Sequence, residues 1–423
     1  MVDLARCDPA IARILDRALE GRELPAADIE RLFSTDGAEL DAAVAAADLL
    51  RRSTVGDRVT YVVNRNVNFT NVCVKRCGFC AFSRGHRAEE GYFLPPEEVV
   101  RRAQEAWELG ATEVCIQAGL PPRMRGSFYI DLCRAVKQAV PGLHIHGFSP
   151  EEVLYGSQRA RISVQEYLCA LKDAGVGSLP GTSAEILDDA VRDLISPGRI
   201  TTAEWIHVIT AAHRLGIPTT STIMYGHIET PRHLAAHLVL LREIQKQTGG
   251  ITEFVPLSFI HSEAPMFRKS LVPGIRAGAT RNEVLRMYAV SRLALNGQIS
   301  NIQATWVKQG TQLAQACLAA GANDFGGTLM NESISTAAGA SHGQFLRPSE
   351  IRALIRGAGR VPAERSTTYR IRRIFEVEPE IPDPLDRIEA GAARFGSYQI
   401  LVASSDFRFK TESRSASIDP PLH

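Results

Sequence analysis

From about residue 60 onward, short β-rich runs alternate with helical stretches, and this alternation leaves few folds open to the chain. Eight runs have the composition of β-strands: Thr60–Asn68, Glu113–Ala118, His144–Phe148, Ser178–Gly181, Thr219–Tyr225, Thr252–Phe259, Asn301–Val307 and Asp324–Thr328. The stretches between them, such as 96–109, 202–215 and 231–247, have helical length and apolar spacing. Such alternation predicts parallel strands joined by crossover helices.

Eight βα units predict an α/β fold of the closed (βα)8 type, a barrel resembling the TIM fold. The alternative is an open doubly wound sheet. That fold ordinarily has fewer strands and a glycine-rich first turn, and no GxGxxG pattern follows the first run. In a barrel the chemistry gathers at the C-terminal ends of the strands, so we expect functional side chains directly after each β-rich run.

Segments of different character flank the predicted barrel, which we place at residues 59–345. Residues 1–58 form a predicted N-terminal helical extension, because Ile11, Ile14 and Leu15 follow helical spacing and an alanine-rich run continues the pattern. Residues 346–423 form a predicted helical and irregular C-terminal extension. Its end, residues 404–423, has the Ser, Arg, Asp and Pro content of a poorly ordered tail.

Composition narrows the class of protein. Of the 423 residues, 45% are hydrophobic and 22% charged, which suits a large soluble domain. The 48 basic and 47 acidic residues nearly balance, so no overall field attracts nucleic acid and we expect small-molecule partners. We find no apolar run of membrane-spanning length and no signal peptide, and therefore expect a cytoplasmic protein without membrane contact.

Three of the eight cysteines stand on one short loop directly after the first β-rich run. Cys73, Cys77 and Cys80 form a CxxxCxxC array. Thiolates bind iron-sulfur clusters, and a loop can wrap three of them around one cubane while leaving one iron open to a ligand. The alternative is a zinc knuckle, which requires a fourth Cys or His at short spacing, and only His86 lies nearby. The pattern favours the cluster.

This loop, with Phe79 before the last cysteine, resembles the radical S-adenosylmethionine (SAM) superfamily. Five segments (64–73, 116–121, 144–150, 224–230 and 253–257) resemble the second component of 7,8-didemethyl-8-hydroxy-5-deazariboflavin (FO) synthase, and the likeness runs from about residue 40 to 370. The resemblance implies a 4Fe-4S cluster on Cys73, Cys77 and Cys80, with SAM as the second cofactor.

The same resemblance implies a reaction in the biosynthesis of FO and coenzyme F420. A 5′-deoxyadenosyl radical takes a hydrogen from L-tyrosine, the Cα–Cβ bond breaks, and the 4-hydroxybenzyl radical adds to 5-amino-6-(D-ribitylamino)uracil. The implied partners are a low-potential electron donor and FO synthase subunit 1, which closes the deazaflavin.

Six further residues are candidates for the site. The resemblance places Phe79, Gly119 and Glu185 against SAM. A core aromatic explains Phe79 equally, a helix-capping role after Thr182 explains Glu185 equally, and Ala118 replaces the first glycine of the superfamily's glycine-rich segment. The candidates for substrate contact stand at or beyond strand ends, where a hydrogen-bonded barrel side chain is the alternative. They are His146, Tyr225 and His227.

Other functions stay open at this point. Aminofutalosine synthase and the dehypoxanthine futalosine cyclase of menaquinone biosynthesis share the loop and the barrel, although segments 64–70 and 253–257 fit FO synthase better. The non-enzymatic alternative is an iron-sulfur electron carrier. A carrier holds its metal without cleaving SAM, whereas the enzyme releases deoxyadenosine.

Overall fold

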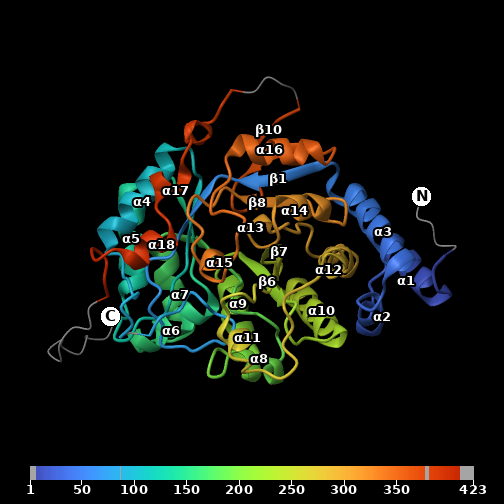
Figure 1. Cartoon of the computed structure of the whole chain (residues 1–423), viewed down its shortest axis with the longest axis horizontal. Coiled ribbons are helices and arrows are strands. Elements are labelled where there is room, and N and C mark those ends of the chain that lie inside the picture. The colour runs from blue at the N-terminus through green and yellow to red at the C-terminus, as the bar shows by residue number, and fades with distance from the viewer. Residues whose placement is uncertain (1–5, 86, 377–380, 410–423) are drawn as a thin grey trace.

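Parallel strands occupy the centre of the molecule and helices surround them (Figure 1). The computed structural model describes residues 6–85, 87–376 and 381–409. The barrel strands are β1 (Arg58–Val62), β2 (Asn64–Val67), β3 (Glu113–Ile116), β4 (His144–Gly147), β5 (Val176–Ser178), β6 (Thr219–Tyr225), β7 (Ile251–Ser258) and β8 (Asp324–Gly327).

The strand pairs form a circuit, although the ladders are not continuous. One sheet has the order β2-β3-β4-β5, β6 pairs with β7, and β1 pairs with β8. Isolated parallel bridges join these parts, namely Leu179 to Thr219, Phe254 to Ile302 and Gln303 to Asp324. Only Val63 separates β1 from β2, so the circuit returns to its start. This arrangement agrees with the expected barrel.

Three expected strands differ from the structure, and the first of them, Thr60–Asn68, is divided at Val63 into β1 and β2. The run Asn301–Val307 is not a strand, because only Ile302 and Gln303 form bridges and helix α13 (Trp306–Gln309) begins within it. The buried Trp306 indole donates a hydrogen bond to the Gly327 carbonyl at 3.0 Å, which turns the chain away from the ladder. The strand expected at 178–181 ends earlier as β5, since Pro180 has no N–H to donate.

Helices connect or follow the strands, and several of them begin at sequence-encoded caps. They include α4 (Pro96–Glu108), α5 (Phe128–Ala139), α6 (Pro150–Ala160), α7 (Val164–Asp173), α8 (Asp189–Ile195), α9 (Thr202–Arg214), α10 (Pro231–Thr248), α11 (Pro265–Arg268), α12 (Arg281–Leu295), α14 (Thr311–Cys317) and α15 (Ile334–Ala337). Ser149 with Glu152 and Thr280 with Glu283 form capping boxes at α6 and α12. Each box satisfies N–H groups that a helix end leaves free.

The N-terminal segment is helical, as expected. Helices α1 (Pro9–Leu19), α2 (Ala26–Leu32) and α3 (Gly37–Val55) form one edge of the molecule in Figure 1. Helix α3 packs on α12, and α2 packs on α10. Among the described residues, no helix combines the length and apolarity needed to cross a lipid bilayer.

The C-terminal segment contains strands that were not expected. After α16 (Pro348–Gly357), strand β9 (Val361–Arg365) pairs in parallel with β1, and β10 (Ile371–Ile374) pairs with β9. The segment continues through η1 (Pro384–Arg387), α17 (Gly391–Phe395) and α18 (Tyr398–Ala403). This pairing places part of the predicted extension against the barrel.

The expectation of a disordered tail from residue 404 is wrong for its first residues. Phe93 N donates to Phe407 O at 2.7 Å, and Phe409 N donates to Gly91 O at 2.8 Å, so residues 407–409 pair with the chain beyond the cysteine loop. The rest of that predicted tail, residues 410–423, lies outside the described residues.

Candidate active site

A cavity of about 230 Å³ opens at the C-terminal ends of the strands. The cysteine loop forms one wall, and the segments after β3, β4, β5 and β7 form others. All three loop cysteines line it, as do Phe79, Gly119 and Glu185. The structure therefore brings the predicted cluster ligands and the predicted SAM contacts to one place.

Backbone hydrogen bonds clamp the cysteine loop on both sides. Val74 N donates to Leu120 O at 2.8 Å, and Gly78 N donates to Ile195 O at 2.8 Å. Gly78 O accepts from Met266 N at 2.7 Å, and a Cβ at Gly78 would lie 2.9 Å from the Met266 Cβ. The loop thus presents its thiols from a fixed backbone.

The donor set fits an iron-sulfur cluster. Burial raises the pKa of Cys77 to about 12 and also raises that of Cys73, so these thiols need a nearby cation to ionise. Iron supplies that charge. Among the residues the structure describes, these three cysteines line the cavity together, and no histidine or fourth cysteine lines it with them. His86 lies outside the described residues.

Gly119 stands where its turn touches the cysteine loop. Its N–H donates to Thr70 O at 2.9 Å, and a Cβ there would lie 2.3 Å from the Val72 carbonyl oxygen. Any side chain would force the two segments apart. The preceding Ala118 N donates to the Glu152 carboxylate at 2.9 Å, so the alanine that replaces the expected glycine is accommodated.

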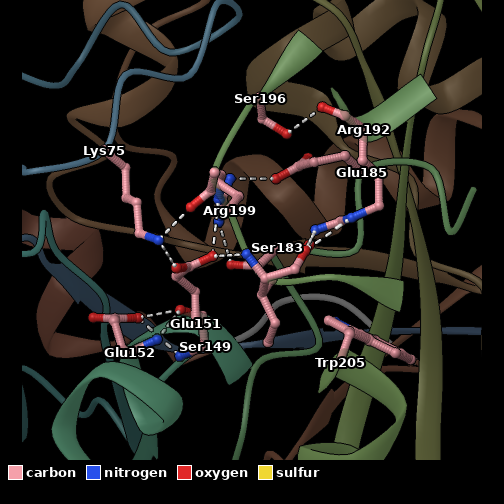
Figure 2. Close-up of polar contacts among 12 residues, drawn as sticks. Lys75, Ser149, Glu151, Glu152, Ser183, Glu185, Arg192, Ser196, Arg199 and Trp205 are labelled. Atoms are coloured by element: carbon pink, nitrogen blue, oxygen red, sulfur yellow. Dashed lines mark hydrogen bonds and ion pairs between the residues drawn. The ribbon is translucent and has the colours of Figure 1, made fainter. Parts of the chain in front are cut away.

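Charged side chains form a network on one wall, and Figure 2 shows Arg199 at its centre. Arg199 Nη1 lies 3.0 Å from Glu185 Oε1, and its Nε lies 3.2 Å from Glu151 Oε2. Lys75 Nζ lies 3.2 Å from Glu151 Oε1. The guanidinium carbon lies 5.7 Å from the Phe79 ring centroid. Arg199 therefore fixes two predicted SAM contacts, Phe79 and Glu185, relative to each other.

The capping explanation for Glu185 is wrong, because no helix begins at Thr182. The next helix, α8, begins at Asp189 with Asp188 as its cap. Glu185 instead adopts a positive φ of 45° and holds its carboxylate against Arg199. A conformation that a residue with a Cβ rarely adopts is characteristic of functional loops.

Sequence reasoning missed Glu152, although its signal was present. It belongs to the capping box Ser149-Pro150-Glu151-Glu152 directly after β4, where barrel chemistry is expected. Burial raises the Glu152 pKa to about 7, against the opposing effect of hydrogen bonds from Ser149 and Ala118. The carboxylate lines the cavity and holds the Gly119 turn in place through Ala118 N.

Lys308 was also missed. It lies on α13, one residue beyond the run Asn301–Val307, so the rule that places chemistry at strand ends identifies it. Its side chain lines the cavity, and within the described chain it has no hydrogen-bond partner and no carboxylate within 4.0 Å. Burial lowers its pKa, with Glu332 opposing.

The three candidates for substrate contact lie elsewhere. His146 is buried on β4, where its Nδ1 lies 2.7 Å from Ser178 Oγ. His227 Nε2 lies 3.0 Å from Met224 O, and its Nδ1 lies 3.4 Å from Glu229. Tyr225 is buried, and its hydroxyl has no partner among the residues described. None of the three lines the cavity, so substrate contact by them stays a prediction.

Comparisons with known proteins agree with the site. Residues 67–241 match the model of the Radical SAM superfamily, and residues 248–378 match that of the CofH/MqnC C-terminal region. Crystal structures of methylornithine synthase (PylB) and of the hydrogenase maturase HydG from Carboxydothermus hydrogenoformans share the fold. Their TM-scores are 0.61 and 0.65 at 18% and 16% identity, over 82% and 85% of this chain and 95% and 80% of theirs. This likeness confirms the predicted TIM-barrel-like α/β fold.

Curated relatives are closer in sequence. The 5-amino-6-(D-ribitylamino)uracil–L-tyrosine 4-hydroxyphenyl transferases of Methanothermobacter thermautotrophicus and Methanocaldococcus jannaschii are 52% and 50% identical, over 80% and 77% of this chain and 92% and 90% of theirs. FO synthase of Mycobacterium leprae is 48% identical over 81% of this chain, which spans only 39% of that longer protein. The chain therefore belongs to the radical SAM superfamily and, within it, to the family of 5-amino-6-(D-ribitylamino)uracil–L-tyrosine 4-hydroxyphenyl transferases.

Proposed function

We propose that this protein is a radical SAM transferase that joins the 4-hydroxybenzyl group of L-tyrosine to 5-amino-6-(D-ribitylamino)uracil, in the synthesis of FO and coenzyme F420. The observation that carries the proposal is the clamped loop that presents three thiols to one cavity. The loop supports the cofactor chemistry, and 52% identity to a named transferase supports the substrates.

The cofactors of this enzyme are a 4Fe-4S cluster and SAM. Bound in the cavity, they supply the 5′-deoxyadenosyl radical that starts the reaction. Cys73, Cys77 and Cys80 would hold the cluster, with Phe79, Gly119 and Glu185 toward SAM. The network of Arg199 with Glu151 and Glu185 sets these contacts before SAM binds, so little ordering remains to be done on binding.

The far wall of the cavity is largely apolar. Leu257, Phe259, Ile260, Ile334 and Ala338 line the cavity together with the cysteine loop. A wall of this kind excludes water from the reacting atoms, so a carbon radical meets the chosen substrate bond rather than solvent. Confinement is therefore the task of these residues.

The expected partners follow from the same proposal. A low-potential electron donor reduces the cluster, and FO synthase subunit 1 converts the adduct. The long FO synthases support the second partner, because this chain matches only 39% of their length and leaves room for another catalytic unit. We place the protein in the cytoplasm, supported by eight cysteines of which none forms a disulfide.

The test is an anaerobic assay. Protein reconstituted with iron and sulfide is mixed with dithionite, SAM, L-tyrosine and 5-amino-6-(D-ribitylamino)uracil, and the products are analysed by mass spectrometry. We expect deoxyadenosine together with a tyrosine-dependent hydroxybenzyl adduct of the uracil. If deoxyadenosine forms without that adduct, the protein is a radical SAM enzyme that acts on the futalosine substrates instead. If the cluster is stable and no deoxyadenosine forms, the protein is an electron carrier.

A further inference from the structure

The charged side chains that line the cavity are of two kinds. Lys75, Glu151, Glu185 and Arg199 neutralise one another through the ion pairs drawn in Figure 2. Lys308 also lines the cavity, yet its ammonium has no hydrogen bond and no carboxylate within 4.0 Å among the described residues. Its ammonium is thus a half-buried positive charge that no carboxylate of the described residues pairs with, and it is available to a charged group of a bound ligand.

The backbone that carries Lys308 is held firmly. The Thr305 hydroxyl donates to Pro256 O at 2.8 Å, and the Trp306 indole N–H donates to Gly327 O at 3.0 Å. Trp306 is 1% exposed, so α13 is anchored in the barrel core. A cation on such a support has a fixed place, as a substrate-orienting group requires.

Glu332 is the nearest candidate for an internal partner, and it is occupied. Its carboxylate accepts the Ser335 N–H at 2.8 Å at the start of α15. It lies close enough to oppose the lowering of the Lys308 pKa, but it forms no ion pair with the ammonium. Lys308 is therefore only partly compensated within the protein.

We propose that Lys308 binds the carboxylate of the amino-acid substrate, an inference that rests on the proposed function. Of the two substrates, only L-tyrosine carries a negative charge at neutral pH, since the aminouracil is uncharged. The wall of Phe79, Glu185 and Arg199 is the one that would hold SAM, and Lys308 takes no part in its ion pairs, which leaves the ammonium for the tyrosine carboxylate. Binding it would pair a lysine charge that the protein leaves unpaired in the cavity.

This assignment predicts discrimination by charge. Tyramine, which lacks the carboxylate, would leave the ammonium unpaired in the cavity, so the wild-type protein should use it far less well than tyrosine. Lys308→Met removes the charge and keeps the length of the side chain. It should raise the KM for tyrosine by about 10- to 100-fold, leave the KM for SAM unchanged, and reduce the preference for tyrosine over tyramine.

The experiment compares Lys308→Met and Lys308→Arg with Lys269→Met, which removes an exposed lysine beyond α11. Each reconstituted protein is checked for iron content, and tyrosine binding is measured by calorimetry without reductant alongside the steady-state assay. We expect weak binding for Lys308→Met, partial recovery for Lys308→Arg, and wild-type values for Lys269→Met.

Two results overturn the inference. One is an unchanged tyrosine affinity in cluster-loaded Lys308→Met, and the other is a raised KM for SAM in place of tyrosine. If Lys308→Met does not fold, the same readings are taken from Lys308→Gln and Lys308→Arg. Wild-type protein that binds tyrosine through Lys308 but forms no uracil adduct refutes the proposed function alone, and wild-type protein that binds no tyrosine refutes both.

Discussion

Two groups of polar side chains occupy opposite ends of the same barrel, and they differ in what they leave unsatisfied. The upper group is the cavity wall with the three thiols, the Arg199 network and Lys308. The lower group lies toward the N-terminal ends of the strands and consists of Asn64, Glu113, Glu253, Asp324, Arg365 and Tyr369.

The lower group satisfies itself. Arg365 contacts Asp324 at 2.5 and 3.1 Å and lies 3.5 Å from Glu253. Tyr369 donates to Glu253, and the Asn64 amide donates to Glu113 at 3.0 Å. The Arg365 guanidinium carbon lies 4.0 Å from the Tyr369 ring centroid. Because β9 brings Arg365 to this end, the C-terminal segment closes the barrel there.

The two groups differ in whether their polar side chains find partners within the protein, and this difference separates structural from functional residues. Each member of the lower group has a partner within the protein, so it contributes to stability. The upper group retains one ammonium without such a partner among the described residues, together with three thiols that can still bind metal, and that residual capacity is what a cofactor or substrate can use.

Cys77→Ala should abolish turnover, because three thiolates are needed to hold the cluster while one iron stays open. The measurement is iron content, visible absorbance and deoxyadenosine release after anaerobic reconstitution. Cys115→Ala is the matched control, since Cys115 lies in the barrel but does not line the cavity. Full activity in Cys77→Ala would refute the cluster assignment.

Arg365→Met should lower the free energy of unfolding by about 3–5 kcal/mol, because it leaves Asp324 and Glu253 buried without their cation. Urea unfolding monitored by circular dichroism measures it. Arg268→Met is the control, as its ion pair with Glu263 is exposed and should contribute less than about 1 kcal/mol. If folded Arg365→Met bound less cluster per molecule, the lower group would contribute to cofactor binding and not to stability alone.

Glu185→Gln should weaken SAM binding by about 10-fold while changing stability little, because Arg199 keeps its ion pair with Glu151. Equilibrium dialysis with labelled SAM on reconstituted protein gives the affinity. Glu204→Gln, in the exposed capping box of α9, controls for loss of a carboxylate. An unchanged affinity for SAM would mean that Glu185 does not contact SAM and only positions Arg199.

His237 offers the smallest effect, seen only through pH. Its Nδ1 accepts from Leu187 N at 3.1 Å and its Nε2 donates to Thr222 O at 3.0 Å, and burial lowers its pKa to about 3. Because the folded pKa is depressed, its stabilising contribution is present above pH 6.5 and is lost as pH falls.

Between pH 6.5 and 5.5 the stability gap between wild type and His237→Gln should therefore narrow by about 1 kcal/mol, since glutamine does not titrate. Urea unfolding at both pH values, on protein without cluster, measures the gap. A gap that stays constant would mean that His237 takes up protons equally in the folded and unfolded states, so that its pKa is not lowered by burial.

Local sequence determined much of the fold. Alternating β-rich and helical runs predicted the barrel, and motifs such as Ser149-Pro150-Glu151-Glu152 mark helix starts through contacts within four residues. The run Asn301–Val307 was misassigned because its β-rich composition is overridden by the long-range hydrogen bond of Trp306 to Gly327. Strand β9 was missed because its partner β1 lies some 300 residues earlier in the chain.

The site divides in the same way. By itself the sequence determined the array of Cys73, Cys77 and Cys80, because cluster ligands on one loop depend on spacing that can be read directly. Only the tertiary structure decided that Glu151, Arg199 and Lys308 share their cavity while His146, Tyr225 and His227 do not. Which side chains meet in a barrel depends on strand register and on the direction of each side chain, and both are set by packing across the whole ring.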